Sequence, residues 1–227
     1  MKIKLLEKKE ETPNIFTFKF TKPENFKYTP GQYLVYKIEN EMPDGRGKRR
    51  YFTISSAPFE ETLNLTTKLS KQTSTFKKDL FNLEIGTEIE VSEPGGEFFF
   101  DEKFSHHIFV AGGIGITPFR SMLLDFKNKH QNPNIVLMYA CKDEVILFNE
   151  ELENLKNTLS NFNIEMFNPE NPLTPEAIYS KFHNLEDSAI YLSGPEPMVE
   201  KFLLNLEEMG IDRNSIKRDY FPGYDWK

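Results

Sequence analysis

The stretch RRYFTISSAP, residues 49–58, joins a short strand pattern to an unusual number of hydrogen-bonding groups. Residues such as Phe52, Thr53 and Ile54 favour a β-strand, because aromatic and β-branched side chains suit a pleated surface. Two arginines precede this pattern, two serines follow it, and a proline ends it. A charged, glycine-containing loop leads into the stretch. So many polar groups at one strand end raise the question of what they bind.

Around this stretch, the first hundred residues read as short strands separated by turns. Strand patterns cover residues 15–20, 33–38, 63–69 and 88–91. In the first of them, Phe16, Phe18 and Phe20 alternate and share one face. One short helix is expected from about Ser74 to Leu83. Several short strands between turn signals favour a closed antiparallel barrel or a sandwich.

From about residue 104 the pattern changes to alternating strands and helices. Strands are expected at 108–111, 135–139, 164–167 and 189–192, and helices near 118–127, along 148–159, from Pro175 and from Pro197. Thr117 and Thr174 are placed as helix N-caps, and Gly210 suits the end of the last helix. This alternation predicts a mostly parallel sheet covered on both faces. We therefore expect a β-barrel domain over residues 1–103 and an α/β domain over 104–227.

Composition and charge exclude several classes of protein. The chain has 227 residues, a net charge of −7 and one cysteine, Cys141. A single cysteine excludes an internal disulfide and a Cys₄ cluster, and the adjacent His106 and His107 would point to opposite faces of a strand, so we expect no metal site. The acidic balance argues against nucleic acid as a partner. No apolar run approaches a membrane span, and the N-terminus lacks a signal-peptide pattern, so a cytoplasmic protein is expected.

A glycine-rich loop, GGIGITP at residues 112–118, joins a buried strand to the start of a helix. Glycine lets the backbone approach a ligand closely, and a helix N-terminus offers N–H groups and partial positive charge to a pyrophosphate. Because the loop lacks the third glycine of the dinucleotide fingerprint, a tight structural turn is the alternative interpretation. A second glycine turn, SGP at 193–195, is expected at the same carboxyl edge of the sheet, where such proteins bind ligands.

Read in order, these motifs resemble those of the ferredoxin–NADP⁺ reductase superfamily. The matching segments are PGQY (30–33), RYFT (50–53), EPGGEF (93–98), GGIGITP (112–118), SGPEPM (193–198) and DYFPGY (219–224). RYFT is similar to the flavin-binding R-x-[YF]-[ST] of that family, and GGIGITP to its nicotinamide-nucleotide loop. Two positions depart from the pattern: Glu93 replaces a glycine, and Ser193 replaces a cysteine that many members carry. The resemblance covers nearly the whole chain.

The resemblance implies an FAD-binding antiparallel barrel and an NAD(P)-binding α/β domain. Such a protein is an NAD(P)H oxidoreductase that passes a hydride between nicotinamide C4 and flavin N5, held about 3–3.5 Å apart, and passes electrons onward to a separate acceptor. In this role Arg50 would pair with the FAD pyrophosphate, Phe52 would lie against the isoalloxazine ring, and Thr53 would reach N5. The other flavin-binding residues implied by position are Tyr51, Leu65, Thr66, Thr67, Lys68 and Ser74.

The same resemblance places the nicotinamide nucleotide in the second domain. The implied binding residues are Gly112, Gly113, Gly115, Thr117, Pro118, Lys142, Gly194 and Pro195. Ser193 would help to orient the nicotinamide ring, and Thr53, Ser193 and Asp219 are the expected catalytic residues. Either Tyr224 or Trp226 would cover the flavin, or both pack on the surface. Lys142 slightly favours NADPH over NADH, although this side chain could equally be solvated.

Three functions stay open. The leading one is a stand-alone FAD-containing reductase whose acceptor is a ferredoxin-like or flavodoxin-like protein or another redox partner. The second is an NAD(P)H:flavin reductase that uses flavin as a substrate. The third is a non-autonomous electron-transfer subunit of a larger complex. A candidate docking patch for a redox partner consists of Lys48, Arg49, Lys71 and Lys77.

Overall fold

The computed structural model describes residues 1–39, 44–45, 47–69, 73–142, 145–183, 185 and 187–221. The chain divides into two compact units, Met1–Phe99 and Phe100–Lys227. This division falls at 99/100, whereas the sequence places the domain boundary at 103/104. None of the helices in the described ranges is long and apolar enough to cross a membrane.

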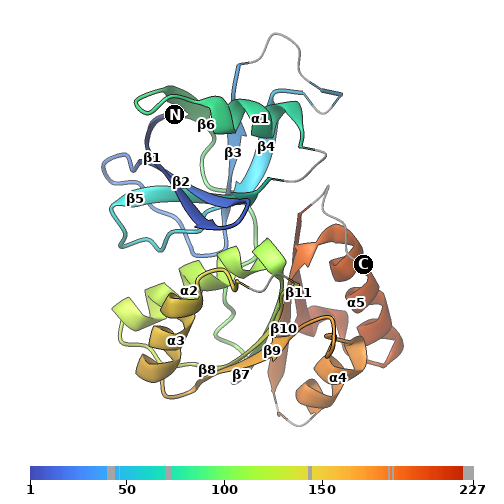
Figure 1. The fold of residues 1–227 in the computed structure, drawn as a ribbon. Helices are drawn as coiled ribbons and strands as arrows, with labels where there is room; N and C mark the ends of the chain where they lie inside the picture. Colours follow the sequence, from blue (N-terminus) through green and yellow to red (C-terminus); the bar gives the residue numbers. More distant parts are fainter. Residues whose placement is uncertain are drawn as a thin grey trace. The chain divides into compact units, whose positions relative to one another are not determined.

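The first unit is a six-stranded antiparallel sheet in the order β4-β3-β6-β1-β2-β5 (Figure 1). Its elements are β1 (Lys2–Thr12), β2 (Ile15–Thr21), β3 (Tyr33–Lys37), β4 (Arg49–Thr53), β5 (Thr62–Lys68), α1 (Thr75–Asn82) and β6 (Glu88–Val91). The outer strands β4 and β5 meet through a bridge between Ile54 and Leu65. The N–H of Ser55 also donates to the carbonyl oxygen of Asn64 (2.9 Å). These contacts close the sheet into the predicted barrel.

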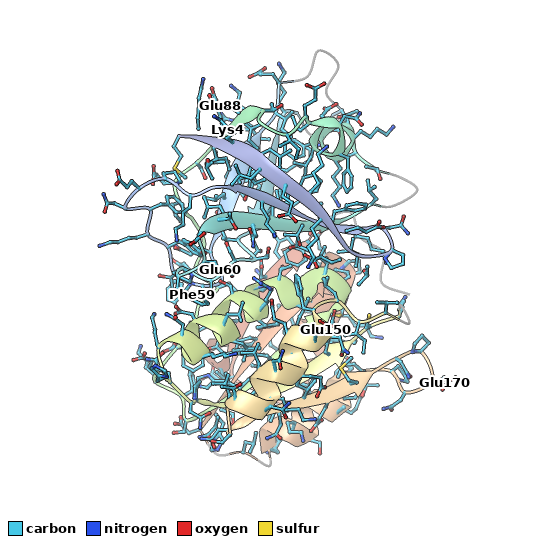
Figure 2. All side chains as sticks on the ribbon, turned by 60° about the vertical axis from the view of Figure 1, so that its left-hand side comes forward. Lys4, Phe59, Glu60, Glu88, Glu150 and Glu170 are labelled. Carbon is cyan, nitrogen blue, oxygen red and sulfur yellow. The ribbon has the colours of Figure 1, made fainter. Side chains whose placement is uncertain are left out.

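Strand β1 is an element that the sequence patterns did not reveal, because its sequence KIKLLEKKEET is dominated by charged residues. Within its first half, Ile3 and Leu5 are buried in the barrel core. The charged side chains lie on the outer face, where Lys4 stands opposite Glu88 of β6 in the strand register (Figure 2). Pairing with β2 on one side and β6 on the other therefore defines this strand, rather than apolar alternation.

The barrel core confirms the predicted alternation of β2. Phe18 and Phe20 are fully buried, whereas Phe16 is half-buried and packs against the core. Phe16 and Phe18 meet the ring of Phe81 edge-on, with centroids 4.9 and 5.0 Å apart. Helix α1 adds Phe76 to the same core, so its first turn is fixed against the barrel.

The second unit is a five-stranded parallel sheet in the order β11-β10-β7-β8-β9. Its elements are β7 (His106–Gly112), η1 (Gly113–Ile116), α2 (Thr117–Asn128), β8 (Asn134–Ala140), α3 (Asn149–Thr158), β9 (Phe162–Phe167), α4 (Pro175–His183), β10 (Ser188–Pro195), α5 (Glu196–Glu208), η2 (Arg213–Ser215) and β11 (Ile216–Phe221). Helices α2 and α3 cover one face, and α4 and α5 the other (Figure 1). The predicted parallel sheet with helices on both faces is confirmed.

The central strand β7 shows why the strands of this unit have continuous apolar sequences. Ile108 and Val110 pack into a core with Phe202 of α5, whereas Phe109 stacks on Phe119 of α2 with ring centroids 4.5 Å apart. Both faces of the strand are therefore buried.

The helix ends confirm two of the three predicted caps. Thr174 Oγ1 accepts the N–H of Ala177 (3.2 Å), and Gly210 follows α5 with a left-handed φ of 92°. The prediction of Thr117 as an N-cap is wrong, because η1 runs directly into α2 and Thr117 is already helical. Its hydroxyl instead donates to the carbonyl oxygen of Ile114 (3.1 Å).

Candidate functional site

Arg50 is a charged side chain buried in the barrel wall, with only 6% of the residue exposed. Its Nη2 donates to Asp44 Oδ1 (2.6 Å), and its Nη1 donates to the carbonyl oxygens of Gly47 and Arg49 (2.8 Å each). The guanidinium carbon also lies 5.6 Å from the centre of the Phe76 ring. A buried cation needs such a shell of acceptors, and the carboxylate within it shows that this place accepts an anion.

The N-terminus of α1 meets the same carboxylate. Asp44 Oδ2 accepts the N–H of Thr75 (3.2 Å), and the N–H of Asp44 donates to Thr75 Oγ1 (3.0 Å). Ser74 caps the helix by accepting the N–H of Lys77 (3.3 Å). A helix N-terminus favours anions because its first N–H groups lack intrahelical acceptors. Asp44 therefore bridges a guanidinium and a helix N-terminus, as the oxygens of a phosphate group would.

Side chains along β4 alternate between its two faces. Arg50 and Phe52 share one face, where the Phe52 ring lies 5.7 Å from that of Tyr36 and 5.9 Å from that of Phe76. Arg49 and Tyr51 lie on the opposite face, and Tyr51 is 66% exposed. The anion site and an aromatic surface thus share a face, whereas Tyr51, also predicted to bind flavin, turns away from it. Thr53 is buried where β4 ends.

Strand β5 carries the other predicted flavin-binding residues of the barrel. Leu65 lies in the core, and Thr66 Oγ1 is hydrogen-bonded to the hydroxyl oxygens of Ser55 (2.8 Å) and Thr17 (2.9 Å). Thr67 is fully buried, and the carbonyl oxygen of Lys68 accepts Lys77 Nζ (3.0 Å). Packing and internal hydrogen bonds occupy the side chains of Leu65 and Thr66, and the backbone of both residues pairs with β2.

In the second unit, the glycines between β7 and α2 serve two different purposes. A Cβ atom at Gly115 would lie 2.1 Å from the carbonyl oxygen of Ser193, and one at Gly112 would lie 2.5 Å from Met198 Sδ. Both positions therefore need glycine so that the loop can pack closely against β10 and α5. Gly113 has a φ of 52°, and apart from its chain neighbours no atom of the described residues lies within 4 Å of its Cβ position. It lies on the open side of the loop, where the backbone can meet a ligand.

Ser193 lies near the carboxyl end of β10, in register with Ala111 of β7 and Asp219 of β11. The two catalytic residues predicted for this unit, Ser193 and Asp219, are thus neighbours on adjacent strands. Ser193 is fully buried, and its hydroxyl has no hydrogen-bond partner among the described residues. Because an unsatisfied buried hydroxyl is costly, its hydrogen-bonding capacity points to a group outside those residues. Gly194 and Pro195 follow Ser193 and are both buried, and Met198 packs over Gly194 in the core of this unit.

A cavity of about 650 Å³ opens at the carboxyl ends of β8 and β9, beside α4 and α5. This volume lies within the range of about 300–1,000 Å³ that is common for small-molecule sites. Lys142, predicted from the sequence, lines it together with Lys201 and Glu176. The pKa of the Glu176 carboxyl is held below its usual value, first by a hydrogen bond from its own backbone N–H in the first turn of α4 and then by one from the side chain of Thr174. The cavity therefore carries both signs of charge.

Sequence patterns missed most of the cavity, because its lining comes from four separate elements and their loops. Phe167 ends β9, Glu176 begins α4, and Lys201 and Phe202 belong to α5. The run NPENPLTP at residues 168–175, rich in turn residues before a helix, was the available signal. No cluster of three or more His, Cys, Asp or Glu side chains suited to a metal ion occurs within the described part of the chain.

Three predicted residues lie outside the described ranges. They are Tyr224 and Trp226, the candidates for covering the flavin, and Lys71 of the basic patch.

Two family models match the chain and together span most of it. Residues 2–100 match the oxidoreductase FAD-binding domain, and residues 109–203 match the oxidoreductase NAD-binding domain. The chain therefore belongs to the ferredoxin–NADP⁺ reductase-like family of flavoprotein oxidoreductases, as the sequence motifs predicted.

Relatives and solved structures agree with this family. The chain is 26% identical over 238 residues to a flavohemoprotein of Oceanobacillus iheyensis (96% of this chain, 58% of the relative). It is also 26% identical over 230 residues to a glycine betaine monooxygenase reductase subunit of Pseudomonas aeruginosa (93% of this chain, 62% of the relative). The chain thus spans about three fifths of the length of these curated relatives. A ferredoxin–NADP⁺ reductase structure from Plasmodium falciparum shares the fold, with a TM-score of 0.79, 20% identity, and coverage of 97% of this chain and 95% of that one.

Proposed function

We propose that the chain is an NAD(P)H-dependent flavoprotein reductase that binds FAD in the domain predicted over residues 1–103 and NAD(P)H in that over 104–227. One observation carries the flavin assignment: a carboxylate already sits between Arg50 and the N-terminus of α1. The site therefore fits a pyrophosphate, and Phe52 supplies an aromatic surface on the same face of β4.

In this proposal Arg50 and the N–H groups beside Ser74 would hold the pyrophosphate of FAD. Phe52 would lie against the ring system, and Thr53 would supply a hydroxyl where β4 ends. Backbone atoms of Leu65, Thr66 and Thr67 would border the flavin. When bound, FAD would accept a hydride from the nicotinamide and release electrons singly or as a pair, so the chain's own task is to bind and orient.

The nicotinamide nucleotide is proposed to bind along the carboxyl edge of the parallel sheet. The loop from Gly112 to Pro118 would receive its pyrophosphate, because the open side at Gly113 exposes backbone next to η1 and α2. Ser193 and Asp219 would orient the nicotinamide ring from adjacent strands.

The cavity next to Lys142 would take the adenosine half of the nucleotide. Of the described residues, Lys142 and Lys201 contribute ammonium groups to its lining and Glu176 contributes a carboxylate. This balance slightly favours the 2′-phosphate of NADPH. Comparing flavin reduction rates with NADPH and NADH would decide between the coenzymes.

Replacing Ser193 by alanine should slow flavin reduction by NAD(P)H by about tenfold, because the nicotinamide would lose one orienting hydrogen bond. The measurement is stopped-flow absorbance of the FAD-loaded protein. Stability should not fall, since the substitution removes a buried hydroxyl that has no partner among the described residues. An unchanged reduction rate would contradict the proposed role of Ser193.

An NAD(P)H:flavin reductase is the second candidate, and the ion pair between Asp44 and Arg50 favours it, because an anion already held at the flavin site weakens flavin binding. An absorption spectrum beside an NAD(P)H-dependent dye-reduction assay separates the two. Yellow purified protein with activity supports a resident cofactor. Colourless protein that becomes active with added flavin supports flavin as a substrate. Protein without activity in either case would indicate a non-autonomous subunit.

The onward acceptor is proposed to be a separate redox protein, in keeping with relatives whose names denote reductase subunits. Arg49, Lys48 and Lys77 are the described members of its candidate docking patch. A cytoplasmic location belongs to the same proposal, and cell fractionation would test it.

A further inference from the structure

Asp44 lies where the proposed function places the pyrophosphate of FAD. One carboxylate oxygen contacts Arg50 Nη2 at 2.6 Å, and the other accepts the N–H of Thr75 at 3.2 Å. The N–H of Asp44 closes a second hydrogen bond to the hydroxyl of Thr75 (3.0 Å). The two oxygens are thus divided between a buried guanidinium and a helix N-terminus, which are the two positive features assigned to the pyrophosphate.

Neighbouring groups hold the guanidinium of Arg50 in place. The carbonyl oxygens of Gly47 and Arg49 hold its Nη1, the ring of Phe76 lies against its guanidinium, and its side chain is 8% exposed. A phosphate and a carboxylate at the same donors would repel each other, because like charges interact strongly in a site of low dielectric. Asp44 is 27% exposed, so its carboxylate has a route to water. A pyrophosphate that takes these donors would therefore displace the carboxylate of Asp44 from Arg50.

We propose that Asp44 is a tethered internal anion that competes with the FAD pyrophosphate for Arg50 and the N-terminus of α1, and thereby sets the affinity for flavin. This inference rests on the proposed function, in which Arg50 binds FAD. In the flavin-free chain Asp44 neutralises a guanidinium whose buried charge would otherwise be uncompensated. When FAD binds, one anion replaces another at the same donors. Asp44 consequently governs how readily the protein exchanges its flavin.

The test compares flavin affinities of the full chain, freed of flavin, by fluorescence titration with FAD and with riboflavin. Asp44→Asn removes the charge and retains an oxygen that can accept the N–H of Thr75. We expect FAD to bind about tenfold more tightly to this variant, because the pyrophosphate no longer displaces a charged partner. Riboflavin, which has no phosphate, should bind with unchanged affinity. Asp44→Ser removes the same charge with a smaller side chain and should change the FAD affinity in the same direction.

Glu90→Gln is the matched control, because it removes one negative charge from β6 at a carboxylate that pairs with Lys37 (3.0 Å). It should leave both flavin affinities unchanged. Thermal unfolding provides a second readout. Flavin-free Asp44→Asn should melt at a lower temperature than the flavin-free wild type, and FAD should raise the melting temperature of the variant by more than it raises that of the wild type.

The possible outcomes separate the inference from the proposed function. Equal or weaker FAD binding by both Asp44 variants, or an equal gain for riboflavin, would overturn the competition. If the wild type and the variants all failed to bind FAD, both the proposed function and the competition by Asp44 would be wrong.

Discussion

Replacing Arg50 by alanine should abolish tight binding of FAD. The guanidinium is buried, and it offers charge-assisted hydrogen bonds that are each worth about 1.5–3 kcal/mol. Losing them should weaken FAD binding by roughly a hundredfold or more. Fluorescence titration of the flavin-free variant with FAD measures this change, and circular dichroism checks that the barrel remains folded.

Arg49→Ala is the matched control for this prediction. Arg49 precedes Arg50 in the chain, carries the same charge and is exposed on the opposite face of β4. Its removal should leave the FAD affinity within about twofold of the wild-type value, because an exposed charge is screened by water and salt. Equal retention of FAD by the two variants would show that the assumed register of the flavin motif is wrong.

Replacing Gly115 by alanine should unfold or severely destabilise the nucleotide-binding unit. The added methyl group would lie 2.1 Å from the carbonyl oxygen of Ser193 and 2.7 Å from Cα of Gly194. Both are backbone atoms of β10, so η1 and the strand would have to move apart. Overpacking of this kind costs about 3 kcal/mol or more. Thermal unfolding should show a lower transition, and NAD(P)H binding should be lost.

Gly113→Ala provides the comparison within the same loop. Within the described ranges, no atom beyond its chain neighbours lies within 4 Å of its Cβ position, so the expected cost is that of a left-handed φ of 52°. That conformation costs a non-glycine residue about 1–2 kcal/mol. A loss of stability at Gly113 as large as that at Gly115 would contradict the close packing of η1 against β10.

Local patterns in the sequence were sufficient to predict most of the fold. The strand–glycine–helix order around residues 112–118 led to the parallel sheet, because buried strands and helix starts leave short-range signals. Strand β1 left no such signal, since its charged side chains face outward and its pairing partners lie far along the chain. Strand β11 (Ile216–Phe221) was missed for a similar reason. Five of its residues are half-buried or exposed, so it has no apolar run, and it is defined by pairing with β10 at the edge of the sheet.

The candidate sites were predictable only in part. Motif positions identified Arg50, Ser193 and the glycine loop, and the structure adds that Arg50 is buried and that Ser193 adjoins Asp219. The role of Asp44 could not be predicted, because its contacts with Arg50 and Thr75 depend on α1 folding back beside β4. The cavity near Glu176 likewise depends on β8, β9, α4 and α5 coming together.

Anaerobic reduction of the FAD-loaded chain by NADPH or NADH, followed through the visible absorption of the flavin, tests directly whether the chain is an NAD(P)H-dependent flavoprotein reductase. We predict that the purified chain binds FAD and that one of the two coenzymes bleaches the flavin band. Arg49→Ala should behave like the wild type, and Arg50→Ala should fail to retain FAD. A chain that binds no FAD, or a bound flavin that neither coenzyme reduces, would contradict this function.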